Sequence, residues 1–199
     1  MRKIYLALIC FIFMFGHVSW SQDSQPQLSP AKLPGGFLGG GIVTNELGLF
    51  GISLEQHITS RFAFYGNAGV GTWGWKLGGG IQCYLDEPCY RSAISIGYSH
   101  ASGMAGMETD MEVEPYGDEE TVDLNLKSTG SINMVYSYNI RVGRMNKFVI
   151  NAGYAIPLEN EPYEIKTPGV ELNDQSKEVM RIMQPGGIVL GVKFMFALR

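Results

Sequence analysis

Large apolar side chains alternate with small or polar ones along most of this sequence, in segments about ten residues long. Neighbouring side chains of a β-strand point to opposite faces, so a period of two indicates strands that are apolar on one face only. The last segment has Ile188, Leu190, Val192, Phe194, Phe196 and Leu198 on one face, and Val189, Gly191, Lys193, Met195 and Ala197 on the other. A single helical turn is expected near residues 174–183. No other segment longer than a loop has the 3.6-residue period of a helix.

The alternation predicts eight strands and an all-β fold. The strands are expected at about 35–44, 48–58, 62–72 and 76–85, and around the runs 93–99, 132–141, 148–156 and 188–198. The connections differ between the two sides: one side has short turns only, whereas the other carries two long loops, 102–124 and 159–185. Short turns at one rim and longer loops at the other are typical of bacterial outer-membrane barrels.

The composition of the two faces indicates which one is buried. The face without large apolar residues consists mostly of Gly, Ala, Ser and Asn, which is a poor surface for water but suits the filled interior of a narrow eight-stranded barrel. The large apolar residues would then point outward to lipid. Aromatic girdles are expected from Phe62, Tyr90, Phe148 and Phe196 at the short-turn rim and from Trp73 and Trp75 at the other. The fold prediction is therefore an eight-stranded antiparallel up-and-down transmembrane β-barrel.

The N-terminal part of the chain has the pattern of an export signal. Basic residues precede an apolar run at 4–15, and a small-residue cleavage site before Gln22 makes residues 1–21 a secretory signal peptide. Residues 22–34 are polar and contain proline, as expected of a periplasmic lead-in, which leaves 35–199 for the barrel. The 17% content of charged residues and the net charge of −4 argue against a disordered chain or a nucleic-acid-binding protein.

Two cysteines, Cys83 and Cys89, remain after cleavage of the signal. A tight hairpin at residues 84–88 would bring them together, and an oxidising compartment would allow a disulfide. The alternative is a pair of reduced thiols at a strand end, since spacing does not test disulfide geometry.

The chain combines a cleaved signal, glycine-rich strands such as GISLEQHI and FAFYGNAGVG, and a closing strand GIVLGVKFMFAL. In these features it resembles the small eight-stranded outer-membrane barrels related to OmpA, OmpW and OmpX, including the outer membrane beta-barrel domain proteins of Bacteroidetes. The resemblance covers about residues 35–199 and implies an outer-membrane location in a Gram-negative cell, in contact with lipid and lipopolysaccharide. It departs from the family at the C-terminus, where Ala197, Leu198 and Arg199 follow the aromatic Phe196.

The loop at 102–124 is strongly acidic and contains no Lys or Arg. Its carboxylates are Glu108, Asp110, Glu112, Glu114, Asp118, Glu119, Glu120 and Asp123. Oxygen ligands suit Ca²⁺ or Mg²⁺, which makes the first four of these residues candidate metal ligands; the alternative is a solvated, self-repelling loop. Met104, Met107 and Met111 are candidate soft ligands for Cu(I), or flexible apolar contacts. We expect an acidic surface that meets divalent cations or a surface protein partner, and no cofactor.

His100 and Ser102 lie on one face of a strand near the outer rim. They resemble the His-x-Ser of the outer-membrane lipid A deacylase barrels, in which His is the base, Ser the nucleophile and a Glu orients the His. That resemblance implies a hydrolase of lipid A, with Glu108 or Glu112 as the orienting residue. Gly103 stands where that family has Asn, and the motif lies mid-chain. A rim His beside a turn Ser is the alternative, and a protein without enzymatic activity is the main expectation.

Three charged residues, Glu55, Arg141 and Lys193, fall on the face expected inside the barrel. Buried charges require partners, so an interior ion-pair network is expected, with His57 at the same end. A gate over a narrow ion path is a second interpretation of this network. A soluble lipocalin-like barrel that binds an apolar ligand is the remaining alternative for the whole chain, and it requires the large side chains to point inward.

Overall fold

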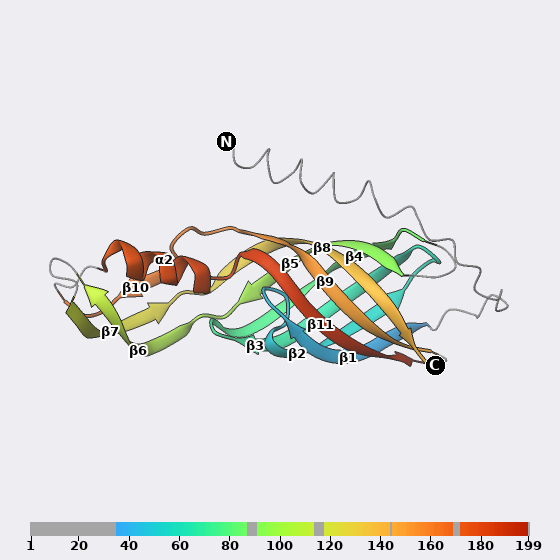
Figure 1. Ribbon diagram of the computed structural model, residues 1–199, viewed down its shortest axis with the longest axis horizontal. Coiled ribbons are helices and arrows are strands. Elements are labelled where there is room, and N and C mark those ends of the chain that lie inside the picture. The colour runs from blue at the N-terminus through green and yellow to red at the C-terminus, as the bar shows by residue number, and fades with distance from the viewer. Residues whose placement is uncertain (1–34, 87–90, 114–117, 144, 169–171, 199) are drawn as a thin grey trace, which may run out of the picture. The chain divides into compact units, whose positions relative to one another are not determined.

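The computed structural model describes residues 35–86, 91–113, 118–143, 145–168 and 172–198. The expected signal peptide and lead-in lie outside these residues. The described chain forms a closed antiparallel barrel with the strand order β1-β11-β9-β8-β5-β4-β3-β2 (Figure 1). The barrel strands are β1 (Gly36–Val43), β2 (Gly48–His57), β3 (Phe62–Gly71), β4 (Gly74–Tyr84), β5 (Ser92–Ala101), β8 (Thr129–Val142), β9 (Asn146–Pro157) and β11 (Gly187–Leu198). The prediction of an eight-stranded antiparallel barrel is confirmed.

The first and last strands close the barrel by pairing with each other. Gly36 pairs with Leu198 at one end of the β1–β11 ladder, and Val43 pairs with Gly191 at the other. The remaining barrel strands follow one another around the wall in chain order, as in an up-and-down barrel. Both ends of the barrel chain therefore lie at the rim with the short turns.

The outward and inward faces of the strands follow the predicted parity. Leu54 is 47% exposed on the outside of β2, whereas its neighbours Ser53 and Glu55 are 2% and 5% exposed and face the interior. The same alternation of exposed apolar and buried small or polar side chains runs along β11, from Ile188 to Leu198. The prediction that the large apolar side chains lie outside is confirmed.

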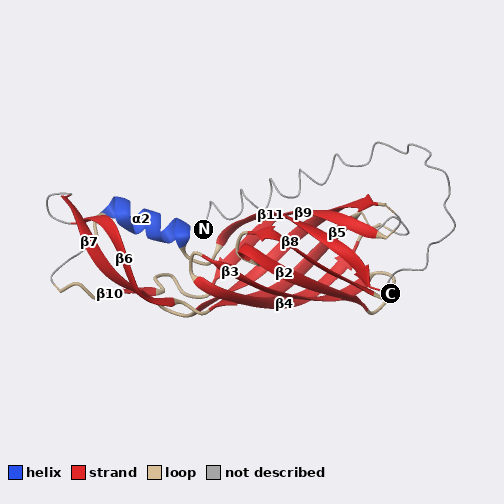
Figure 2. Cartoon of the chain, turned by 90° about the horizontal axis from the view of Figure 1, so that it is seen from below, coloured by secondary structure: helices blue, strands red, loops and turns tan. Residues whose placement is uncertain are grey.

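The two long connections are folded, which corrects the expectation that they are loops. The first forms a hairpin of β6 (Met104–Val113) and β7 (Asp118–Leu126), and the second contains β10 (Tyr163–Ile165) and the helix α2 (Asp174–Met183). Strands β10, β7 and β6 form a separate three-stranded sheet in that order (Figure 2). We call this sheet and α2 together the platform.

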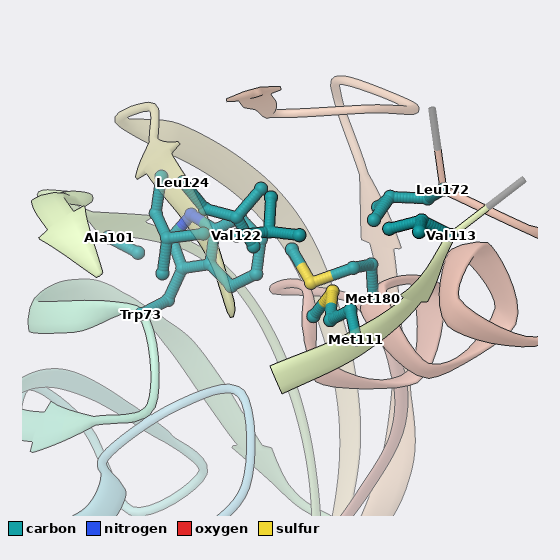
Figure 3. Packing of buried hydrophobic residues seen from close by; sticks show 9 residues of the cluster. Trp73, Ala101, Met111, Val113, Val122, Leu124, Leu172 and Met180 are labelled. Atoms are coloured by element: carbon teal, nitrogen blue, oxygen red, sulfur yellow. The ribbon is translucent and has the colours of Figure 1, made fainter. Parts of the chain in front are cut away.

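The platform has its own hydrophobic core. Val122, Leu124 and Leu126 of β7 are buried in one cluster with Met111 and Val113 of β6 and Met180 of α2. Figure 3 shows Val122 and Leu124 close to Trp73, and Met111 beside Met180. Trp73 and Ala101 of the barrel rim belong to the same cluster, so the core joins the platform to the rim. Trp73 was expected in an outer girdle. It is instead 0% exposed, and its Nε1 donates to the Lys127 carbonyl at 2.9 Å.

Helix α2 has clear start and stop signals. Asn173 is the N-cap, and its Oδ1 accepts a hydrogen bond from the Ser176 amide at 2.8 Å. Asp174 in the first turn and Arg181 in the last suit the helix dipole. The Gln184 amide donates to the Met180 carbonyl and ends the helix before Pro185. Among the described residues, no helix is both long and apolar enough to cross a membrane.

Candidate functional site

The outside of the barrel carries a continuous apolar surface, which we call the outer face. Every barrel strand contributes large exposed side chains to it: Leu38, Ile42, Phe50, Ile52, Phe62, Phe64, Trp75, Leu77, Ile94, Ile96, Ile132, Met134, Ile150, Tyr154, Ile188 and Leu190 are examples. Along the described barrel strands, the outward positions carry no Asp, Glu, Lys or Arg. Water-soluble proteins rarely expose more than a few hundred Å² of contiguous apolar surface. The outer face is therefore unlike the surface of a typical water-soluble protein.

Aromatic residues stand at both rims of the outer face, but fewer than the sequence predicted. Phe62 and Phe196 are exposed at the short-turn rim, Phe148 is half-buried there, and Trp75 is exposed at the opposite rim. Tyr90 lies outside the described residues.

The interior of the barrel is polar. Ser53 donates to Asn67 and Ser137 donates to Asn151, both at 2.7 Å, across neighbouring strands. A second group near the opposite rim joins Ser99, Ser131 and Asn133 at 2.9–3.1 Å. Such an interior does not fit the apolar ligand cavity of the lipocalin-like alternative.

Near the short-turn rim, the interior holds a charged cluster around Glu55. The Lys147 Nζ lies 2.7 Å and 2.9 Å from the two Glu55 carboxylate oxygens and 2.8 Å from the Tyr84 hydroxyl. Tyr84 also donates to Glu55, and His57 Nε2 lies 3.1 Å from the same carboxylate. The Phe37 ring lies 4.2 Å from the Lys147 ammonium and completes the enclosure. Because the charges are paired and hydrogen-bonded, their burial is tolerated.

Glu55, Arg141 and Lys193 are the residues that the sequence places in this network. Glu55 is buried, but its cation is Lys147, which the sequence analysis did not single out. Lys193 is also buried, and its Nζ lies 3.9 Å from a Glu46 carboxylate oxygen in a separate pair. Arg141 lies on the same face as Lys147, its register partner on β9, but its side chain is exposed at the rim, near the end of β8.

The short turn between β1 and β2, residues 44–47, folds into the barrel mouth; we call it the inserted turn. Asn45 adopts a left-handed φ of 66°, and its side chain donates to the Gly186 carbonyl at 2.7 Å and accepts from the Gly186 amide at 3.0 Å. Ser99 donates to the Asn45 carbonyl at 2.9 Å from the interior wall. Glu46 and Leu47 are both buried. The mouth at this end is therefore occupied by the chain itself.

Two glycines make room for the inserted turn. A Cβ atom on Gly69 would lie 2.0 Å from the Leu47 carbonyl oxygen, and one on Gly51 would lie 2.6 Å from the Leu47 side chain. The strands predicted at 35–44 and 48–58 leave only a short connection here, with no sign that it turns into the barrel. The glycines at these two interior positions are the sequence feature that indicates room for the inserted turn.

No known family model matches this chain, and no curated protein matches it. The small closed barrel expected from the resemblance is present in the structure. Membership of the OmpA, OmpW or OmpX families has no support from these comparisons.

In the structure, the side chains of His100 and Ser102 each contact other groups. The Ser102 hydroxyl donates to the Gly103 carbonyl at 3.0 Å and accepts from the Trp75 amide at 3.1 Å. His100 Nδ1 lies 3.5 Å from the Tyr98 hydroxyl. Glu108 is exposed on β6, in register with Asp123. This arrangement brings together no base, nucleophile and orienting carboxylate.

The four candidate metal ligands lie along β6 and just beyond it. Asp110 accepts from Thr121 at 2.7 Å, and Glu112 accepts from the Asn173 amide side chain at 2.6 Å. Glu114 lies outside the described residues. Within the described ranges, no three His, Cys, Asp or Glu side chains converge on a possible metal position. Glu108 and Asp110 instead contribute to an exposed acidic face of the platform.

The remaining candidates concern sulfur. Met111 is 7% exposed in the platform core, which corrects its assignment to an exposed loop, whereas Met104 is exposed and Met107 half-buried. Cys83 is half-buried near the end of β4. Cys89 lies outside the described residues, and so does the expected disulfide.

Proposed function

We propose that this protein is an integral outer-membrane β-barrel with a filled interior, which presents the platform as an interaction surface outside the cell. The observation that carries the proposal is the outer face. It encircles the closed barrel, and the outward positions of the described strands carry no charged side chain. In a bilayer every backbone polar group must be bonded internally, and a closed barrel meets this condition because it has no edge strands. A soluble location would leave the whole outer face in water.

The filled interior supports a structural or interactive role rather than general diffusion. The Glu55 cluster occupies the interior near one rim, and the inserted turn occupies the mouth at the other. Eight-stranded barrels are just wide enough for side chains to fill. These features support a barrel that does not conduct solutes of ordinary size.

The platform supports the interactive part of the proposal. It has its own core, so its outward side chains are held on folded elements rather than on a mobile loop. One face of β6 carries the exposed carboxylates of Glu108 and Asp110, opposite the buried Met111. Such a surface would attract divalent cations, including those that bridge lipopolysaccharide, or a basic surface partner.

Fractionation of expressing cells, followed by gel electrophoresis of the extracted protein with and without boiling, tests the proposal. A membrane barrel partitions with the outer membrane and migrates as a compact form that slows on heating. Recovery in the soluble periplasmic fraction, with no change of mobility on heating, would overturn it. The variant Ile96→Arg provides a control, because a charge on the outer face should reduce the folded membrane form without altering a soluble protein to the same degree.

A further inference from the structure

Strand β6 lies at an edge of the platform sheet, whose order among the described residues is β10-β7-β6. Strand β7 pairs with one side of β6, from Met107 to Val113. In an antiparallel pair the residues alternate: one turns its N–H and C=O groups toward the partner strand, and the next turns them away. Every second residue of β6 therefore presents its backbone groups to the side without a strand.

The hydrogen bonds of Glu112 show which residues these are. Its carbonyl accepts from the Asn173 amide at 3.2 Å and from the Ser176 hydroxyl at 3.0 Å, so it points away from β7. By the alternation, Glu108 and Asp110 turn their backbone groups the same way. Among the described residues these groups have no backbone partner on that side. An edge of this kind is a template for another strand.

The chain itself occupies only the Val113 end of this edge. Leu172 forms an isolated antiparallel bridge with Val113, and the chain then turns into α2. In the other direction the edge is unpaired as far as Met107, beyond which the register shifts and Gly106 takes a left-handed φ of 66°. The unpaired stretch, residues 107–111, has the length of a short strand.

Helix α2 leaves an apolar side uncovered next to this edge. Successive residues of a helix are turned by about 100°, which gives α2 three sides. Met180 is buried against the sheet, and Lys177 faces a cleft that Tyr163 of β10 also lines. The third side carries Val179 and Ile182, which are 45% and 74% exposed. Because β10 and β6 are opposite edges of the sheet, this third side lies toward β6.

The two faces of the sheet differ in chemistry along the open edge. On one face, the carboxylates of Glu108 and Asp110 are exposed. On the other, Met111 is buried, and the uncovered side of α2 adds the apolar Val179 and Ile182. The side chains of an added strand would point alternately to these two faces. Basic residues would complement the first face, and apolar residues the second.

The same charges argue against a second copy of this chain as the occupant. Two β6 edges paired with each other would bring Glu108 and Asp110 close to the same carboxylates of the second copy. Like charges on neighbouring strands are destabilising. A strand of opposite charge is the better match.

We propose that the open edge of β6 binds an extended segment of a partner protein in which basic and apolar residues alternate. The backbone of the segment would pair with Glu108 and Asp110, its basic side chains would meet their carboxylates, and its apolar side chains would cover Val179 and Ile182. The inference rests on the proposed function, because it needs the platform to be presented to other proteins, and it names the kind of partner.

Fluorescence anisotropy of a dye-labelled peptide tests the site, with the full-length folded protein in a zwitterionic detergent. The probe is Lys-Val-Lys-Val-Lys-Val-Lys. Two peptides of the same charge are controls: Lys-Lys-Lys-Lys-Val-Val-Val, which lacks the alternation, and the probe with every backbone amide N-methylated, which cannot donate to a strand. Saturable one-to-one binding of the probe, about tenfold tighter than that of either control, is expected. Hydrogen exchange in residues 104–113 should slow when the probe binds.

The variants Asp110→Ala and Asp110→Pro separate charge from backbone pairing. Both remove the carboxylate, but only proline removes the outward N–H group, and proline is tolerated on the open side of an edge strand. Asp110→Ala should weaken binding about two- to fivefold, and Asp110→Pro by a further factor of about ten. Ile182→Ser leaves β6 untouched and should weaken binding about two- to fivefold. Glu159→Gln is the charge control, because Glu159 is exposed outside the platform sheet, and it should leave binding unchanged.

Absence of saturable binding, equal binding of a control peptide, or equal affinity of the two Asp110 variants overturns the proposal. A dimer that Asp110→Pro dissociates also overturns it, because the edge would then belong to a second copy. Cell fractionation and mobility on unboiled gels are recorded for the same protein. A membrane barrel that does not bind the probe refutes this inference alone, whereas a soluble protein without a heat shift refutes the proposed membrane location.

Discussion

Removing the ammonium of Lys147 should destabilise the barrel strongly, because it leaves a buried carboxylate without its cation. In the variant Lys147→Met, the Glu55 carboxylate stays buried and loses both of its hydrogen bonds to the ammonium, at 2.7 Å and 2.9 Å. The side chains of Glu55 and Lys147 are 6% and 8% exposed, so water does not replace the lost partner. Breaking one side of a buried ion pair typically costs about 3–5 kcal/mol.

The double variant Glu55→Met/Lys147→Met separates the cost of an unpaired charge from the value of the pair. Replacing both charges with apolar groups of similar volume is often neutral or stabilising. The Tyr84 hydroxyl loses an acceptor in the double variant, which offsets part of the gain. We therefore expect the double variant to recover at least about 1 kcal/mol relative to Lys147→Met.

Urea unfolding in detergent, followed by the ratio of fast and slow bands on unboiled gels, measures these free energies. Arg91→Met is the control, because Arg91 is exposed just before β5 and should change stability by no more than about 0.5 kcal/mol. If Lys147→Met unfolds within about 1 kcal/mol of the unmodified protein, or no differently from Arg91→Met, the assigned role of the buried pair is wrong.

Three further perturbations test other parts of the structure. Gly69→Ala should displace the inserted turn and destabilise the barrel by about 1–3 kcal/mol, whereas Gly66→Ala, where the nearest atom to the added Cβ is 4.0 Å away, should be tolerated in the same urea titration. Asn173→Ala should cost about 0.5–2 kcal/mol of helix stability and should expose α2 to limited proteolysis first, while an intact digestion pattern would argue against the cap. Ile96→Arg should cost about 2–4 kcal/mol in lipid vesicles, and a cost near zero would place the outer face away from the bilayer core.

The barrel was predictable because its signal is local. A strand with one apolar face has a period of two, and the parity holds from Ile188 to Leu198 without interruption. The direction of the faces also followed, since small and polar residues alone make a poor outer surface. An even number of strands is also what allows the first and last strands to pair antiparallel, as β1 and β11 do.

The platform was missed although part of its signal is present. In β6, Met107, Met111 and Val113 alternate with acidic residues, which is the same period of two. In the sequence alone these charges indicate a solvated loop, because nothing local shows that a helix from a later loop covers the apolar side. The packing of Met180 against Met111 joins positions that are distant in the sequence.

The interior contacts escaped prediction for a similar reason. Parity places Glu55 inside, but it does not decide which of several cations reaches it. Lys147 lies at the start of β9, where the alternation begins and its direction is least clear. The inserted turn depends on a side chain of one loop bonding to the backbone of another, Asn45 to Gly186, and no periodicity records such a contact.

The ladder between β1 and β11 also sets the order of assembly. The two strands are separated by nearly the whole described chain, so neither can satisfy its outer row of backbone groups until the other has been synthesised and positioned. Until that moment the nascent sheet keeps two open edges, which a lipid phase does not tolerate. In the membrane location proposed above, insertion is therefore expected to be a single concerted event that waits for the last twelve-residue strand, Gly187–Leu198. A chain that lacks this strand is therefore expected to form no stable, partly inserted intermediate.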